Sequence, residues 1–179
     1  MNIVMEDYVL SESQMKEVLE MGFGPTEIHE HSSMMFVHFP NPYRIDDNPI
    51  LTRLVPASGE YYGVGDVDYV PTMTSEDLEK LLPRCIENGG TNTGLIESRG
   101  MDGETWKVCY QGYTPQDILH QSTPVFKGTR KVDVLLDLLR WCVEEKYVIP
   151  KSEKAEVIKE ARLEIDSTLF PDLSWNDET

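Results

Sequence analysis

The sequence contains few cysteines, little positive charge and no long apolar run. Its three cysteines are widely spaced and odd in number, so no disulfide framework is assigned and free thiols in a reducing cytosol are expected. No stretch approaches the ~18 consecutive apolar residues of a membrane-spanning helix. Glu6 and Asp7 stand where a signal peptide would carry basic residues. These absences predict a cytoplasmic protein without a membrane segment.

Acidic residues outnumber basic ones, with 32 Asp and Glu against 16 Lys and Arg and a formal net charge of −16. The excess is concentrated in residues 1–70, which carry twelve acidic and three basic side chains, whereas residues 71–148 carry twelve and nine. Phosphate backbones and anionic lipids repel such a chain, which disfavours direct binding to nucleic acid or membranes. The partner that this charge favours is a basic protein.

Local signals predict one helix and two strands in the first part of the chain. Ser11 and Gln14 form a capping box, which predicts a helix over about 12–21. Short apolar runs predict strands at 34–39 and 50–55, each closed by a proline. The stretch 57–69 is rich in Gly, Tyr and Asp, and its pattern fits either a loop or an irregular strand.

The second part carries stronger signals. Thr74 is a typical N-cap for a short helix, and a turn containing Asp102-Gly103 predicts a hairpin between strands 93–98 and 104–111. Apolar residues at helical spacing predict a helix over about 129–146, and Ser152 predicts a last helix reaching about residue 163. The expected core positions of the second strand and the long helix are Trp106, Val108, Tyr110, Val132, Leu135, Leu136, Leu139, Cys142 and Val143.

These elements predict an α+β fold. A small antiparallel sheet, built from the hairpin together with the 34–39 and 50–55 strands, is expected to pack against a long apolar helix with short helices flanking it. Three regions are expected: an acidic N-terminal region over 1–70, an α+β core over 71–165, and a polar tail over 166–179. The change of composition near Pro71-Thr72 indicates a soft boundary.

The opening run from Tyr8 to Gly22 resembles the Leu-Ser-x-x-Gln-x-Lys-x-Leu-x-x-x-Gly start of small uncharacterised proteins from gut bacteria and their mobile elements. Residues 74–83, 105–110 and 132–147, the last with Trp141, resemble the same proteins in the same order. The region 40–70 departs from them as an insertion. The resemblance implies an accessory protein of phage or mobile-element type, and it carries over no functional residues.

Two groups of residues have the chemistry of metal ligands. His29 and His31 would share one face of an extended strand, with His38 nearby, and Asp66 and Asp68 offer hard oxygen ligands. No further ligand follows at a diagnostic spacing, so a surface loop and an acidic turn remain the competing interpretations. The cysteines (Cys85, Cys109 and Cys142) lack the context of a nucleophile, with Cys109 on the outward register of its strand. No cofactor is predicted.

Two functions from different classes follow. The first is a non-catalytic accessory protein whose acidic N-terminal region binds a basic protein, in its most specific form as a nucleic-acid mimic or inhibitor. Tyrosines beside carboxylates favour recognition, and the predicted contact residues are Asp46, Asp47, Tyr61, Tyr62, Asp66 and Asp68. The alternative is a small metal-dependent hydrolase using His29, His31, Asp66 and Asp68. The oligomeric state is left open.

Overall fold

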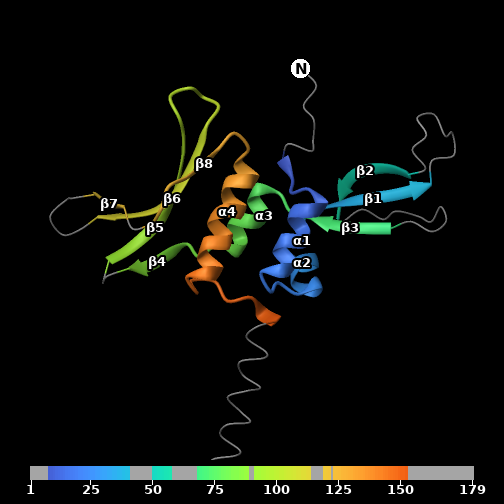
Figure 1. The fold of residues 1–179 in the computed structure, drawn as a ribbon, viewed down its shortest axis with the longest axis horizontal. Helices are drawn as coiled ribbons and strands as arrows, with labels where there is room; N and C mark the ends of the chain where they lie inside the picture. The colour runs from blue at the N-terminus through green and yellow to red at the C-terminus, as the bar shows by residue number, and fades with distance from the viewer. Residues whose placement is uncertain are drawn as a thin grey trace, which may run out of the picture.

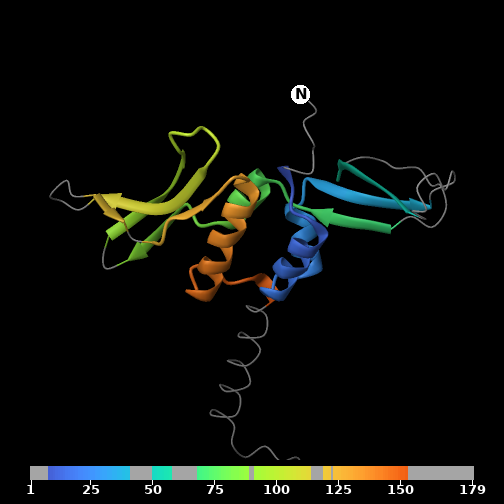
Figure 2. The ribbon, with the colours of Figure 1, turned by 45° about the horizontal axis from the view of Figure 1, so that its top comes forward.

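The computed structural model describes residues 8–40, 50–57, 68–88, 91–113, 119–121 and 123–152. Within these ranges the chain is α+β, with four helices and two antiparallel sheets. The helices stand together in the middle and the two sheets lie on opposite sides of them (Figure 1), an arrangement that the turned view repeats (Figure 2). Below, the N-terminal half means the described residues from 8 to 72, and the C-terminal half means those from 73 to 152.

The first two helices belong to the N-terminal half. They are α1 (Glu12–Glu20) and α2 (Pro25–His31). The predicted capping box of α1 is confirmed. The Ser11 hydroxyl accepts a hydrogen bond from the Gln14 backbone N–H, and the Gln14 side chain accepts one from the Ser11 backbone N–H. Helix α2 was not predicted. Pro25 occupies the first turn of this helix, where its missing N–H costs nothing.

Three strands form the N-terminal sheet. They are β1 (Met34–Pro40), β2 (Ile50–Pro56) and β3 (Asp68–Thr72), in the order β2-β1-β3. The first two were predicted, and β3 begins inside the stretch that the sequence left open. The soft boundary predicted near Pro71-Thr72 falls at the end of this strand. The sheet is tied to the rest by Leu10, whose N–H donates to Met73 O at 2.9 Å and whose carbonyl accepts from the Thr72 hydroxyl at 2.6 Å.

The C-terminal sheet is built around the predicted hairpin. Its strands are β4 (Cys85–Asn88), β5 (Thr91–Arg99), β6 (Trp106–Tyr113), β7 (Leu119–Gln121) and β8 (Phe126–Gly128). The order is β4-β5-β6-β7, and β8 pairs with the first residues of β6. The expectation of one sheet is therefore wrong. Strand β1 takes both of its partners from the N-terminal half, and among the described strands none pairs across the helices.

Helices α3 (Ser75–Leu81) and α4 (Lys131–Glu144) separate the C-terminal sheet from α1 and α2. The stripe predicted for the fourth helix is confirmed as core, with Val132, Leu135, Leu136, Leu139 and Cys142 buried. Val108 and Tyr110 of β6 are buried in the same cluster, as predicted. The sequence predicted an outward position for Cys109, but this residue is only 5% exposed, so the expectation that it faces solvent is wrong. The described residues end at Ser152, so the predicted last helix and tail lie outside them.

Candidate functional site

The structure describes only one of the six predicted contact residues. Asp68 is exposed at the start of β3. The other five lie outside the described residues, and they are Asp46, Asp47, Tyr61, Tyr62 and Asp66. Their assignment therefore stays a prediction. Tyr69, which follows Asp68 in β3, is 47% exposed, so this strand does present an aromatic ring and a carboxylate to solvent.

The strand geometry predicted for His29 and His31 is wrong, because both residues lie in α2. Positions two apart in a helix point about 200° away from each other, so these imidazoles do not share a face. They stand in the last turn, where a cation would complement the helix dipole. Within the described part of the chain, no group of three or more His, Cys, Asp or Glu side chains is placed to hold a metal ion.

His38 is placed differently, in the middle of the N-terminal sheet. The register sets it opposite Thr52 of β2 and opposite Asp68 of β3, so the three residues form one row across the strands. Directly opposed side chains stand on the same face of an antiparallel pair with Cβ atoms about 4.5–5.5 Å apart. The predicted residue Asp68 is thus next to a histidine that the sequence analysis treated only as a neighbour of His29 and His31.

Two polar contacts flank the His38 ring, a hydrogen bond on one side and a carboxylate on the other. Its Nδ1 lies 2.9 Å from Thr52 Oγ1, and its Nε2 lies 3.1 Å from Glu12 Oε1 of helix α1. The imidazole side chain is 18% exposed, so it is largely covered while keeping contact with solvent. Glu12 is the first residue of α1 and directly follows the cap Ser11, so the capping box that starts the helix also sets the carboxylate over the sheet.

The contacts of His38 with Glu12 and Thr52 could not be predicted from the sequence, for a physical reason. The three residues come from α1, β1 and β2, so no local spacing connects them. Only the register of β1 with β2, and the way α1 lies on the sheet, bring the carboxylate, the imidazole and the hydroxyl together. The alternation of Met34, Phe36 and His38 along one face of a strand was readable, but it contains no information about the partners.

One cluster of charged groups in the C-terminal half joins separate elements. The Lys131 ammonium of α4 lies 2.6 Å from Glu79 of α3 and 2.7 Å from Glu97 of β5, and 5.3 Å from the centre of the Trp106 ring. Burial alone would lower the pKa of Lys131, but hydrogen bonds and charge from the two carboxylates outweigh it and raise that pKa. This cluster joins two helices to the sheet.

Asp77 is the most buried carboxylate of the described residues. Its Oδ2 accepts from the backbone N–H of Ser33 and of Thr74, both at 3.0 Å, and from both hydroxyls. Its Oδ1 accepts from Lys80 at 3.0 Å. Burial acts to raise the pKa of Asp77, but these donors outweigh it and hold the pKa below its usual value. The carboxylate therefore fixes α3 to the segment that leads into β1.

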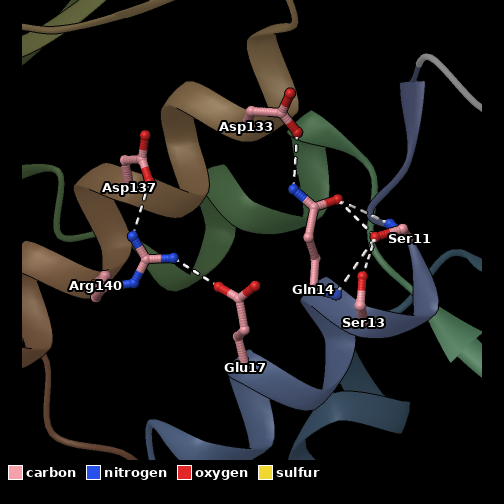
Figure 3. A network of polar contacts seen from close by, with 7 residues as sticks. All are labelled: Ser11, Ser13, Gln14, Glu17, Asp133, Asp137 and Arg140. Carbon is pink, nitrogen blue, oxygen red and sulfur yellow. Dashed lines mark hydrogen bonds and ion pairs between the residues drawn. The ribbon is translucent and has the colours of Figure 1, made fainter.

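A polar seam joins α1 to α4 (Figure 3). Gln14 Nε2 donates to Asp133 at 2.8 Å, and Arg140 donates to Glu17 at 2.6 Å and to Asp137 at 2.8 Å. The ion-paired side chains are roughly half exposed. Long polar side chains thus bridge the halves here, in place of the apolar packing found deeper between the helices.

The cysteines do not have the properties of nucleophiles. Burial raises the pKa of Cys142 to about 11, so its reactive thiolate is scarce at neutral pH. Burial also raises the pKa of Cys109. Cys85 is exposed, but exposure alone does not make a site.

Comparisons with known proteins give no indication of function. No protein-family model matches the chain, and no match is found among curated proteins or solved structures. Within the part that the structure describes, none of the helices is both long and apolar enough to cross a membrane. What the molecule does must therefore be inferred from how its two halves differ in charge and from the groups on the N-terminal sheet.

Proposed function

We propose that this chain is an accessory protein that binds a positively charged protein through its acidic N-terminal region. The observation that carries the proposal is the uneven charge. Residues 1–70 hold twelve acidic and three basic side chains, whereas residues 71–148 are close to balanced. The phage or mobile-element setting implied by the resemblance is part of the same proposal.

Exposed carboxylates on the N-terminal half support this proposal. In the C-terminal half, Lys131, Arg130 and Arg140 each lie within ion-pair distance of at least one carboxylate. In the N-terminal half, Glu20, Glu30 and Asp68 are exposed. Of these three carboxylates, Glu30 forms an ion pair with the Lys151 ammonium at 2.7 Å. Carboxylates that face solvent without local neutralisation raise the rate of encounter with a basic partner and lower it with an acidic one.

The most specific form of the proposal is a nucleic-acid mimic. Carboxylates spread over a surface take the place of phosphates in a groove lined by Lys and Arg, and aromatic rings supply the contact area that charge alone does not. Tyr61, Tyr62, Asp46, Asp47 and Asp66 are the residues proposed for this contact, with Asp68 at its edge. Because exposed charge pairs are screened by salt, such a complex weakens as ionic strength rises.

The test is capture of partners from a bacterial lysate on the immobilised protein, followed by quantitative binding of whatever is retained. We expect a basic nucleic-acid-binding protein to bind at low salt and to be released at high salt. The key variant neutralises four acids of the proposed surface. The substitutions are Asp46→Asn, Asp47→Asn, Asp66→Asn and Asp68→Asn, and they should weaken binding at least tenfold.

A matched control separates a site from bulk charge. It removes the same number of charges from exposed positions of the C-terminal half, as Glu87→Gln, Glu104→Gln, Glu144→Gln and Glu145→Gln. We expect this variant to bind within about twofold of the parent protein. If both variants lose affinity equally, the attraction is a property of net charge and the proposed surface is wrong.

A further inference from the structure

The contacts of His38 carry a second, separate inference. We propose that Thr52 is a nucleophilic hydroxyl, with His38 as its base and Glu12 as the residue that orients the base, and that it accepts the acyl group of small activated esters. The basis is the chain of two contacts, 2.9 Å from Thr52 Oγ1 to His38 Nδ1 and 3.1 Å from His38 Nε2 to Glu12 Oε1. A hydroxyl hydrogen-bonded to an imidazole, with a carboxylate against the other ring nitrogen, is the arrangement that activates a hydroxyl.

The direction of the protons follows from the chemistry of the three groups. A carboxylate oxygen 3.1 Å from Nε2 attracts a protonated ring nitrogen, so Glu12 favours the tautomer that carries its proton on Nε2. A neutral imidazole carries one proton, so Nδ1 then has a free lone pair. In that neutral tautomer the Thr52 hydroxyl donates its proton to Nδ1, which leaves the oxygen lone pairs directed away from the ring. This is the orientation that nucleophilic attack requires.

The surrounding charges favour the state that forms during reaction. When His38 takes the proton it becomes an imidazolium, which lies against Glu12 from α1 and beside Asp68, its register partner in β3. Two carboxylates stabilise that cation. The same carboxylates repel anionic substrates, so the site suits neutral or cationic acyl esters and disfavours phosphate esters.

The step balances without a cofactor. Thr52 Oγ1 forms a bond to the acyl carbon while its proton passes to His38 Nδ1. The bond from the acyl carbon to the leaving oxygen then breaks, and that oxygen departs as an alcohol with the proton from the imidazolium, or as a stable anion. Water cleaves the Thr52 ester in a second, slower step. Thr52 is exposed on β2, so a small substrate reaches it from solvent.

The expected rate is modest. A positioned base raises the reaction rate about 10²- to 10⁴-fold. The three groups supply base catalysis, but none of them is a donor for the developing oxyanion. We therefore expect accumulation of an acyl-threonine with an activated ester, rather than rapid turnover. This makes site-resolved labelling a sharper assay than product release.

The experiment treats the full-length protein with p-nitrophenyl acetate and locates the acetyl group by peptide mass spectrometry. We expect acetylation of Thr52 to be at least tenfold faster than that of other threonines and serines. Thr52→Val removes the site with little change of shape, and Thr52→Ser should retain it. His38→Gln should lower labelling of Thr52 at least tenfold. His29→Gln, which changes an exposed histidine on α2, should leave it unchanged.

Glu12→Gln tests the positioning residue by a property that packing does not control. We expect the rate of Thr52 labelling to fall and its pH profile to move, and ¹⁵N NMR of the His38 ring to report loss of the single Nε2–H tautomer. Labelling confined to lysines and the amino terminus would overturn the proposal. Equal labelling of Thr52 in the parent and in His38→Gln would overturn it as well, because the hydroxyl would then react without its base.

Discussion

The two halves of the molecule use charge and apolar burial in different ways. The C-terminal half contributes β4, β6, α3 and α4 to the main core cluster, and its Lys131 forms ion pairs that join α4 to α3 and to β5. The N-terminal half contributes α1 and α2 to that cluster. Of the described residues in its sheet, none belongs to it, although Phe36 and Val37 are buried elsewhere.

This difference teaches where each kind of function fits. A half that supplies most of the main core cluster serves as a scaffold. A sheet that contributes none of its described residues to the main core cluster can change its surface at lower cost to the fold. Both proposals made above lie on that sheet or in the acidic region around it.

The largest effect should come from a charge in the shared core. Leu139→Asp places an unpaired carboxylate in the fully buried stripe of α4 and should cost more than about 4 kcal/mol, which is enough to unfold most domains of this size. Circular dichroism with urea titration measures the loss. Cooperative unfolding of this variant at parental stability would show that the α4 register is wrong.

The same substitution in the N-terminal sheet tests whether the halves are separable. Phe36 is 8% exposed and lies outside the main cluster, so Phe36→Asp should disrupt β1 to β3. Amide NMR signals of β5, β6 and α4 should persist. Loss of those signals together with the sheet would mean that the molecule is one cooperative unit.

The next largest effect concerns the carboxylate that links the halves. Asp77→Ala leaves the N–H groups of Ser33 and Thr74 without their acceptor and should cost about 2–4 kcal/mol. Because the folded-state pKa of Asp77 is lowered, its contribution is complete at neutral pH and is lost as the pH falls below the usual carboxyl range through that lowered pKa. Acid titrations of the parent and of Asp77→Asn should therefore converge at low pH. Parallel curves would assign Asp77 no such role.

The ion pairs of Lys131 and the ion pair between Glu17 and Arg140 should contribute different amounts to the free energy of unfolding. Lys131→Met leaves Glu79 and Glu97 facing each other beside a half-buried tryptophan, and we expect a loss of about 1–3 kcal/mol. Glu17→Gln in the exposed seam should cost less than about 1 kcal/mol, and that cost should shrink further in high salt. Thermal denaturation at two salt concentrations measures both. Equal losses would remove the distinction between the scaffold cluster and the seam.

The smallest effect is expected at the hairpin turn of the scaffold. Gly103 has φ of 72° with open space where a Cβ would stand, so Gly103→Ala should cost about 1 kcal/mol through backbone strain alone. Gly94 has equally open space without that backbone angle, so Gly94→Ala should change stability by less than about 0.5 kcal/mol. Urea unfolding of both variants checks the pair, and an equal cost would show that space, and not φ, decides.

Much of the local structure could be predicted because its causes are local. The capping box of α1, the apolar stripe of α4 and the Asp-Gly turn between β5 and β6 each act within a few residues. Helix α2 was missed because it has no side-chain cap to mark its start, and strands β4, β7 and β8 were missed because three or four residues show too little periodicity. The split into two sheets depends on which strands find each other, and short-range patterns do not encode that choice.

The candidate site was predictable only in part, for the same reason. Asp68 was selected for its charge, and the structure adds its neighbour His38 through strand register. Thr52 and Glu12 have no unusual local context, so only the assembled sheet reveals their connection to the imidazole. His29 and His31 show the converse: a spacing that would share a face in a strand separates the rings in a helix.

The seam between α1 and α4 also has a consequence for how the chain is made. Gln14 and its partner Asp133 are 119 positions apart, and Glu27 accepts a hydrogen bond from Lys151, 124 positions further on. At a synthesis rate of 5–20 residues per second, Gln14 and Glu27 are synthesised about 6–25 s before those partners. Throughout that interval the buried side of α1, with Met15 and Val18, has no finished surface to cover it. The protein is therefore most exposed to aggregation and to chaperones during the period when its N-terminal half has been synthesised and α4 has not.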